Sequence, residues 1–399
     1  MSIFEQLGVQ PIINACGTVT RLGGAPMPPE VVAAWQAAAQ QAVSLEQLQA
    51  AASVRIARAI QTESGLVTSG AAAAMTLGTA AILCRHDLAR MERLPDTNDM
   101  PNEFIIAREQ RSGYDHAVRA AGAKLVEVGF NELVAGAGVR RTESWEYEAA
   151  ISQRTAGIVY IHTADSRPFL VDVMTLAHKH GIPVLVDAAS ELPPRSNLQA
   201  IPGTGADLVV FSGGKAIRGP QSTGILCGRK ELISSAALQM LDMDDHPQLW
   251  EPPPDLIDRN TFTGMPRHGI GRGFKVSKEE IAALLTALDL FMSGAYDNQS
   301  IIHHKWLKQI ADALAETNAD VRIIEPTAPE QSPSLEIRID PTVTGRTAFD
   351  VCRELRNGTP SIYVGHAKLA QSILALNPAC LTIDSIGPLN SQLRHLLQT

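Results

Sequence analysis

The chain has 399 residues, of which 45% are hydrophobic and 19% are charged, a composition typical of an ordinary soluble globular protein. This length exceeds what one simple core usually organises, so we expect a large domain and a smaller one. The net charge of −8 argues against a protein whose main task is to hold nucleic acid. The five cysteines lie far apart without zinc-ligand spacing, and no metal site is predicted.

The N-terminal sequence has no basic region followed by an apolar segment, and no apolar run reaches the length of a membrane span. We therefore expect a cytoplasmic protein with no membrane partner.

Residues 1–50 are expected to form an N-terminal arm and helix. Glycine and proline are frequent from residue 14 to residue 29, which predicts an ordered arm. Pro28 and Pro29 predict the start of a helix continuing to about residue 42, because proline is tolerated in a first turn. A second, alanine-rich helix is expected over residues 45–61.

Residues 51–290 are expected to form the large domain, in which short apolar strands alternate with helices. The predicted strands cover residues 104–107, 124–128, 157–162, 184–187, 207–211 and 224–227, and the predicted helices cover about 71–83, 116–121 and 171–180. Such alternation predicts an α/β fold with a mostly parallel sheet covered on both faces.

The C-terminal part predicts a small α+β domain over residues 291–399. A proline-rich connector over residues 240–272 and a linking helix over 279–292 precede it. Within the small domain we expect helices over 301–316 and 348–357 and a strand over 334–340.

Two strand ends carry the residues that point most clearly to chemistry. The strand over residues 184–187 ends in Asp187, and the strand over 207–211 leads through Ser-Gly-Gly to Lys215. A strand-end Asp often caps a helix and most lysines are solvated, but a glycine-rich turn after an apolar strand is a poor place for a surface lysine. A pyridoxal 5'-phosphate enzyme needs this pair: the amine forms an imine with the cofactor aldehyde, and the carboxylate keeps the pyridine nitrogen protonated.

A phosphate site is predicted where a strand leads into the helix that begins near residue 71. Ser69, Gly70 and Ala71 offer a hydroxyl, unpaired backbone N–H groups and a favourable helix dipole. Ser212, three residues before Lys215, is a plausible second hydroxyl. Ligands of open α/β sheets bind at the carboxyl ends of strands, where all these residues are expected.

Several segments together carry a family resemblance. They are Asn14–Pro26, Thr68–Met75, and residues 104–116, 187–194, 207–224 and 269–278. The chain resembles the bacterial selenocysteine synthase (L-seryl-tRNA selenium transferase) group of fold-type I pyridoxal phosphate enzymes, and more closely the D-glucosaminate-6-phosphate ammonia-lyase group. The resemblance implies an aspartate aminotransferase-like fold, with a large sheet domain and a small C-terminal domain.

The resemblance also implies roles for individual residues. Lys215 would hold the cofactor covalently and Asp187 would contact its ring nitrogen, while Thr163 would contact its hydroxyl. His116 or Tyr114 would border the ring, and the sequence does not choose between them.

Anionic groups of the substrate would be bound by arginine and lysine. Arg272 and Lys275 resemble a basic pair that the family uses for this purpose, and the weaker candidates are Arg111, Arg218 and Arg21. Relatives often carry an arginine after a Pro-Pro-x-Ile segment that grips a substrate carboxylate. Here residues 359–364 read Thr-Pro-Ser-Ile-Tyr-Val, so the sequence leaves carboxylate recognition unassigned.

The predicted reaction is α,β-elimination from a β-hydroxy amino acid, such as an amino-sugar acid or its phosphate. Lys215 would remove the Cα proton, the β-hydroxyl would leave, and the product would hydrolyse to a 2-keto acid and ammonia. Racemisation or other Cα-proton chemistry is the alternative. Replacement at Cβ on an aminoacyl-tRNA is disfavoured by the acidic charge and by the absence of an additional N-terminal tRNA-binding domain. The resemblance further implies a homo-oligomer, dimer or higher, that acts on a small-molecule amino acid.

Overall fold

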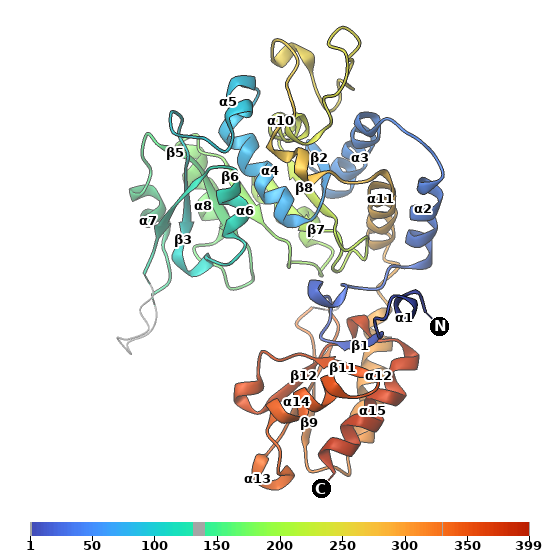
Figure 1. The fold of residues 1–399 in the computed structure, drawn as a ribbon. Coiled ribbons are helices and arrows are strands. Elements are labelled where there is room, and N and C mark those ends of the chain that lie inside the picture. The colour runs from blue at the N-terminus through green and yellow to red at the C-terminus, as the bar shows by residue number, and fades with distance from the viewer. Residues whose placement is uncertain (1, 131–139, 329, 399) are drawn as a thin grey trace. The chain divides into compact units, whose positions relative to one another are not determined.

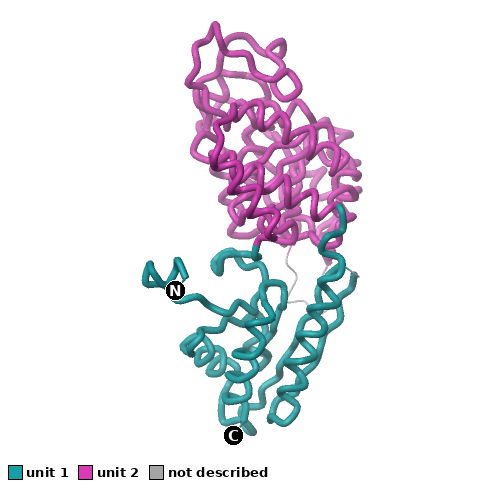
Figure 2. Tube along the Cα trace, turned by 90° about the vertical axis from the view of Figure 1, so that its right-hand side faces the viewer, with its two compact units in different colours: residues 1–26, 293–399 teal, residues 27–292 magenta. Residues whose placement is uncertain are grey.

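The computed structural model describes residues 2–130, 140–328 and 330–398. The chain divides into two compact units, one formed by residues 27–292 and the other by residues 1–26 together with 293–399 (Figure 2). Each unit has its own strands and its own helices (Figure 1).

The larger unit is built on a seven-stranded sheet with the strand order β2-β8-β7-β6-β5-β3-β4. The strands are β2 (Ser64–Thr68), β3 (Glu103–Ala107), β4 (Lys124–Val128), β5 (Thr155–Ile161), β6 (Val184–Asp187), β7 (Leu208–Ser212) and β8 (Gly224–Gly228). Only β8 runs antiparallel to its neighbours, and the remaining neighbouring pairs are parallel. Six strands therefore end at the same edge, and the predicted mostly parallel α/β sheet is confirmed.

Helices account for most of the rest of this unit. They are α2 (Pro29–Ala39), α3 (Leu45–Ile60), α4 (Ala71–Cys84), α5 (Leu88–Arg93), α6 (Asp115–Ala120), α7 (Ser144–Ala149), α8 (Leu170–Lys179), α9 (Asn197–Ala200), α10 (Lys230–Met240) and α11 (Lys278–Met292). Helix α4 is apolar on every side and almost wholly buried, because it packs against the sheet, α6 and α10 at once. The segment between α10 and α11 contains only short 3-10 turns, η4 (Arg259–Thr261) and η5 (Ile270–Phe274).

The smaller unit has two sheets. Strand β1 (Ile12–Ala15) pairs in parallel with β11 (Ser361–Val364), and β10 (Ser334–Arg338) lies between β9 (Asp320–Ile324) and β12 (Ile373–Leu376). Its helices are α1 (Ile3–Gln6), α12 (Gln299–Ala313), α13 (Pro341–Thr344), α14 (Ala348–Asn357) and α15 (Ile383–Leu397). Leucine, isoleucine and valine side chains from these elements form one continuous core.

The expected division of the chain differs from these units at the N-terminus. Residues 1–26 join the C-terminal unit because β1 pairs with β11, a long-range contact that no local pattern reveals. Residues 27–50 join the larger unit because α2 and α3 pack against α11. Across the described parts of the chain, no helix is both long and apolar enough to cross a bilayer.

Candidate active site

The carboxyl ends of β6 and β7 bring Asp187 and Lys215 to one edge of the sheet. The two strands pair in parallel, with Asp187 opposite Val210. The turn after β7 brings the backbone of Gly214 close to that of Gln221, since a Cβ at Gly214 would lie only 2.4 Å from the Cα atom of Gln221. This close approach requires glycine and fixes the position of the adjacent Lys215.

The charges of this pair are poorly stabilised by the protein alone. Burial raises the pKa of Asp187, although an N–H donated by Ala189 at 2.9 Å and the positive charge of Lys215 act in the opposite direction. Burial lowers the pKa of Lys215, against the attraction of Asp187 and Glu191. The Lys215 Nζ atom donates to the Ser190 hydroxyl at 3.0 Å. A protonated pyridine ring would supply the charge that Asp187 lacks, so the residues fit the cofactor predicted from the sequence.

The turn between β2 and α4 has the features of a phosphate cradle. No side chain caps the N-terminus of α4, its first turn holds no acidic residue, and Gly70 has a φ of 94°. A Cβ at Gly224 of β8 would lie 2.5 Å from the carbonyl carbon of Gly70, so backbone packs directly against this turn. The amide N–H groups at the start of α4 are therefore available to an anion.

The two predicted phosphate hydroxyls are placed differently. Gly224 pairs with Thr68 on one side and with Ser212 on the other, so Ser212 lies two strands away from the cradle, at the same edge. The Ser69 hydroxyl donates to the carbonyl of Phe274 at 2.8 Å, and it would have to rotate to donate to a phosphate.

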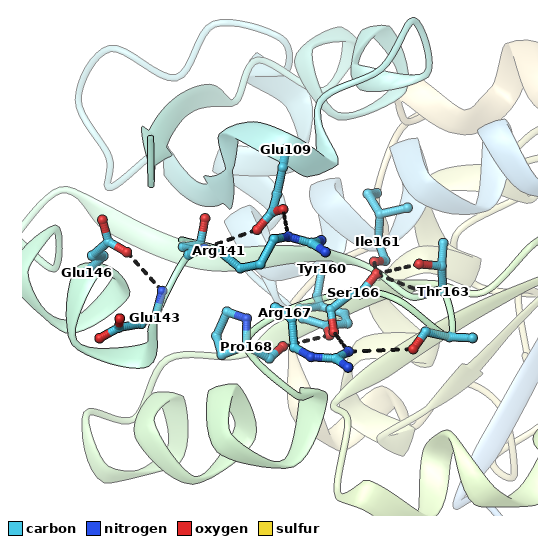
Figure 3. Close-up of polar contacts among 12 residues, drawn as sticks. Glu109, Arg141, Glu143, Glu146, Tyr160, Ile161, Thr163, Ser166, Arg167 and Pro168 are labelled. Atoms are coloured by element: carbon cyan, nitrogen blue, oxygen red, sulfur yellow. Dashed lines mark hydrogen bonds and ion pairs between the residues drawn. The ribbon is translucent and has the colours of Figure 1, made fainter. Parts of the chain in front are cut away.

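Thr163 follows β5 at the same edge. Its backbone N–H donates to the Ser166 hydroxyl at 3.0 Å, and Ser166 donates to the carbonyl of Ile161 at 2.7 Å (Figure 3). The N–H of the preceding residue, His162, donates to the carbonyl of Asp187 at 2.9 Å. The loop thus holds Thr163 beside the strand that carries Asp187.

Arg272 and Lys275 line a pocket of about 360 Å³. The pocket also contains Asp242, which forms an ion pair with Arg272, and Glu280. Within the described residues, Lys275 forms no ion pair and is exposed. The bond from Ser69 to the carbonyl of Phe274 ties this segment to the phosphate cradle. The structure therefore brings the predicted basic pair next to the predicted phosphate site.

The segment after β3 contains Arg111, which the sequence predicts as a binding group for substrate anions. The Arg111 guanidinium forms ion pairs with Asp115 and Glu127. Tyr114 is 70% exposed, and the exposed His116 contacts Arg119 through Nδ1 at 3.2 Å. Nothing in this geometry selects Tyr114 or His116 as the residue that borders the ring.

Arg218 lies in the turn after Lys215. It has a positive φ of 62°, and its backbone N–H donates to the carbonyl of Lys215 at 3.0 Å. The backbone of Arg218 is therefore close to that of Lys215. The geometry does not show which ligand, if any, the guanidinium would bind.

In the smaller unit, Arg21 and a second arginine, Arg356, lie near the same tyrosine ring. Arg356 was not singled out from the sequence. The guanidinium groups of Arg21 and Arg356 lie 5.5 and 5.3 Å from the ring centroid of Tyr363. Among the described residues neither guanidinium pairs with a carboxylate, and the Nε atom of Arg356 is buried without a hydrogen-bond partner. Tyr363 lies in the segment 359–364, where relatives often carry a carboxylate-binding arginine and this chain does not. The sequence signal that could have identified Arg356 is its position shortly before that segment.

The fold and the Asp187–Lys215 edge define a pyridoxal phosphate-dependent enzyme of fold-type I. The family model for L-seryl-tRNA selenium transferase matches residues 12–243, more than half of the chain, and the model for aminotransferase class-V matches residues 134–357. The chain belongs to the L-seryl-tRNA selenium transferase family.

Two relatives match almost the entire chain. D-glucosaminate-6-phosphate ammonia lyase of Salmonella typhimurium is 28% identical, with 100% of this chain and 98% of the relative covered. The 5'-C-glycyluridine monooxygenase-decarboxylase of a Streptomyces species is also 28% identical, with 99% and 92% covered. A solved structure of D-glucosaminate-6-phosphate ammonia-lyase matches with a TM-score of 0.82 at 26% identity, covering 100% of this chain and 98% of that one.

Proposed function

We propose that the protein is a pyridoxal phosphate-dependent ammonia-lyase that acts on an amino-sugar acid or its phosphate and releases a 2-keto acid and ammonia. The observation that carries this proposal is the Lys215 amine, which is within electrostatic reach of the half-buried Asp187 carboxyl and has a pKa that burial lowers. The full-length similarity to an ammonia-lyase supports the reaction class.

The protein's own residues divide the work of holding the cofactor. Lys215 would bind it covalently, Asp187 would contact the ring nitrogen, and Thr163 would contact the ring hydroxyl. The phosphate would be held by Ser69, Gly70, Ala71 and Ser212. When bound, pyridoxal phosphate supplies an electron-accepting ring that acidifies the Cα–H bond of an amino acid.

Lys215 would then act as the base at Cα. An amine can remove a proton only when it is not protonated itself, and burial lowers the pKa of Lys215 toward the working pH. Ser190 accepts a hydrogen bond from the Nζ atom and so holds the amine at the strand end. Loss of the β-hydroxyl from the adjacent carbon would complete the elimination.

The basic pair of the larger unit supports the substrate class. Arg272 and Lys275 line a pocket next to the phosphate cradle. An amino-sugar acid and its phosphate carry anionic groups, which arginine and lysine bind well. Arg218 is a further candidate, whereas Arg111 has carboxylate partners of its own.

The test is an assay of the purified protein with pyridoxal phosphate and a panel of β-hydroxy amino acids, including amino-sugar acids with and without phosphate. We expect ammonia and a 2-keto acid in equal amounts from at least one amino-sugar acid. Exchange or inversion at Cα without ammonia would establish a racemase instead, and turnover limited to seryl-tRNA would establish replacement at Cβ.

The second full-length relative supplies another candidate reaction. This relative is as similar to the chain as the ammonia-lyase is, and it is named as a monooxygenase-decarboxylase. The assay therefore also measures oxygen uptake and carbon dioxide release. Oxygen-dependent loss of carbon dioxide would replace the lyase proposal. The proposal also includes a homo-oligomer in the cytoplasm, which gel filtration with light scattering and cell fractionation test.

A further inference from the structure

A histidine and a glutamate adjoin the proposed catalytic edge without an assigned role. His162 follows β5, and its backbone N–H donates to the carbonyl of Asp187 at 2.9 Å. Glu191 lies in the turn after β6, where its N–H donates to the carbonyl of Ala188 at 3.1 Å. The His162 Nδ1 atom is 3.5 Å from Glu191 Oε2.

The environment of the His162 ring is unusual for a purely structural histidine. Its Nδ1 atom is buried and has no hydrogen-bond partner, although most buried polar atoms have one. The side chain as a whole is 24% exposed, and that of Glu191 is 15% exposed. A movement of a few tenths of an ångström would bring Nδ1–H into hydrogen-bond range of the carboxylate. The Nε2 atom would then be the nitrogen that exchanges protons, as in other histidine–carboxylate pairs.

The charged groups around this pair belong to the same edge. Glu191 acts on the ionisation of both Asp187 and Lys215. The Tyr160 ring lies 6.3 Å from the His162 ring, measured between centroids. Glu191, which faces His162, is therefore within electrostatic reach of Lys215.

The proposed elimination needs a second acid–base group. Lys215 accepts the proton released when the Cα–H bond breaks, while the Cβ–O bond must break with its electrons moving to oxygen. Hydroxide is a poor leaving group unless a proton reaches it as the bond breaks. One base at Cα does not supply that proton at the same moment.

We propose that His162 donates a proton from Nε2 to the departing β-hydroxyl, which leaves as water, and that Glu191 is the positioning residue that holds Nδ1–H. The Cα–H and Cβ–O bonds break, a Cα–Cβ double bond forms, and the neutral imidazole is protonated again from solvent. This inference rests on the proposed lyase function.

The first test compares His162→Gln with His178→Gln. His178 is a matched control because its Nε2 atom lies 3.2 Å from the Asp207 carboxylate next to the amino end of β7, away from the carboxyl edge. In D₂O, His162→Gln is expected to slow ammonia release by about 10²–10⁴-fold while deuterium still enters Cα of the recovered substrate at a rate within about tenfold of wild type. His178→Gln should change neither rate.

A substrate analogue with β-chloride in place of hydroxide sharpens this test, because chloride leaves without a proton. His162→Gln should eliminate chloride at nearly the wild-type rate. If exchange at Cα falls together with ammonia release, or if the chloride analogue is slowed equally, His162 positions the cofactor or substrate and the proposal is overturned.

The second test uses the apoprotein and does not depend on turnover. In NMR spectra of the histidine side chains, the Nδ1–H proton of His162 should be protected from exchange with water, and Glu191→Ala should remove that protection because the accepting carboxylate is gone. Asp207→Asn should leave the His162 signal unchanged. An Nδ1–H signal that Glu191→Ala does not change would overturn the pair. A wild-type protein that releases no ammonia from any substrate refutes the lyase function, whereas this spectrum reports on the pair alone.

Discussion

Two segments at the same edge of the sheet each carry a cation that was predicted to bind a ligand. Lys215 follows β7 and Arg111 follows β3, and the two cations have different partners. Lys215 donates to a serine hydroxyl, and its charge is opposed by burial. Arg111, at the same edge of the sheet, is held by Asp115 and Glu127. Both segments stood out in the sequence. The difference is that the protein pairs the Arg111 guanidinium with two of its own carboxylates and leaves the Lys215 amine beside a neutral hydroxyl.

The largest effect is expected when the amine is removed. Lys215→Ala should abolish the visible absorbance of the bound cofactor and slow ammonia release by at least about 10²–10⁴-fold, because base catalysis and covalent attachment are both lost. Absorbance spectroscopy and a coupled ammonia assay measure the two effects. The control is Lys308→Ala, which changes an exposed lysine paired with Asp312. Retention of the absorbance band by a folded Lys215→Ala protein would contradict the assignment.

Asp187→Asn separates function from stability. Burial raises the folded-state pKa of Asp187 above its ordinary value of 3.8, so the associated stability is fully present below that value and is lost as the pH rises through the folded pKa. The raised folded-state pKa therefore costs the apoprotein stability at neutral pH, relative to a neutral side chain of the same shape. The asparagine variant should have a higher apoprotein Tm at pH 7 than wild type, with little difference below pH 3.8.

The same variant should lose activity by about 10²-fold or more, because about 3 kcal/mol of interaction with a protonated ring nitrogen would disappear. Calorimetry of the apoprotein and steady-state kinetics of the holoenzyme give the two results. Unchanged activity with full cofactor occupancy would remove Asp187 from the ring nitrogen.

A smaller effect is expected at the basic pocket. Lys275→Gln should raise the KM for a phosphorylated substrate about tenfold with kcat nearly unchanged, which corresponds to about 1.4 kcal/mol of binding. Arg272→Gln should have a weaker effect because Asp242 already pairs with that guanidinium. Arg267→Gln, at an 84% exposed arginine paired with Glu92, is the control. An equal KM increase in all three variants would indicate a general charge effect.

The smallest effect on activity is expected for Arg111→Gln. Its loss would leave the Asp115 carboxylate, which is 6% exposed, without its cation and should lower the free energy of unfolding by about 1–3 kcal/mol. The KM should stay within about twofold of wild type. Arg119→Gln, on the helix α6 that carries Asp115, controls for general effects of losing a nearby arginine. A large KM increase without a change in Tm would show that Arg111 binds the substrate and would break the contrast between the two segments.

The sequence predicted the sheet of the larger unit well because its strands are short, apolar and separated by helices. The same pattern located Asp187, Lys215 and the turn at Ser69–Gly70–Ala71 at one edge of the sheet, since each lies at or shortly after the end of a strand. The pairing of β1 with β11 was not predictable, because it joins residues about 350 positions apart. That pairing also moved the first 26 residues into the smaller unit.

The features of the site that the sequence did not predict depend on which side chains the folded chain brings together. The partners of Arg111 were present in the sequence, but only the pairing of β3 with β4 brings Glu127 to it. Arg356 and Tyr363 meet because α14 packs against β11. His162 and Glu191 belong to neighbouring strand ends, so their proximity depends on the parallel pairing of β5 with β6.

The most direct test of the central claim is to reduce the holoenzyme with borohydride, digest it and locate the pyridoxyl group by mass spectrometry. Reduction makes the link between cofactor and amine permanent, so the modified peptide identifies the lysine. We predict one modified site per chain, at Lys215. Modification at another lysine in an active holoenzyme, with Lys215 unmodified, would contradict the account.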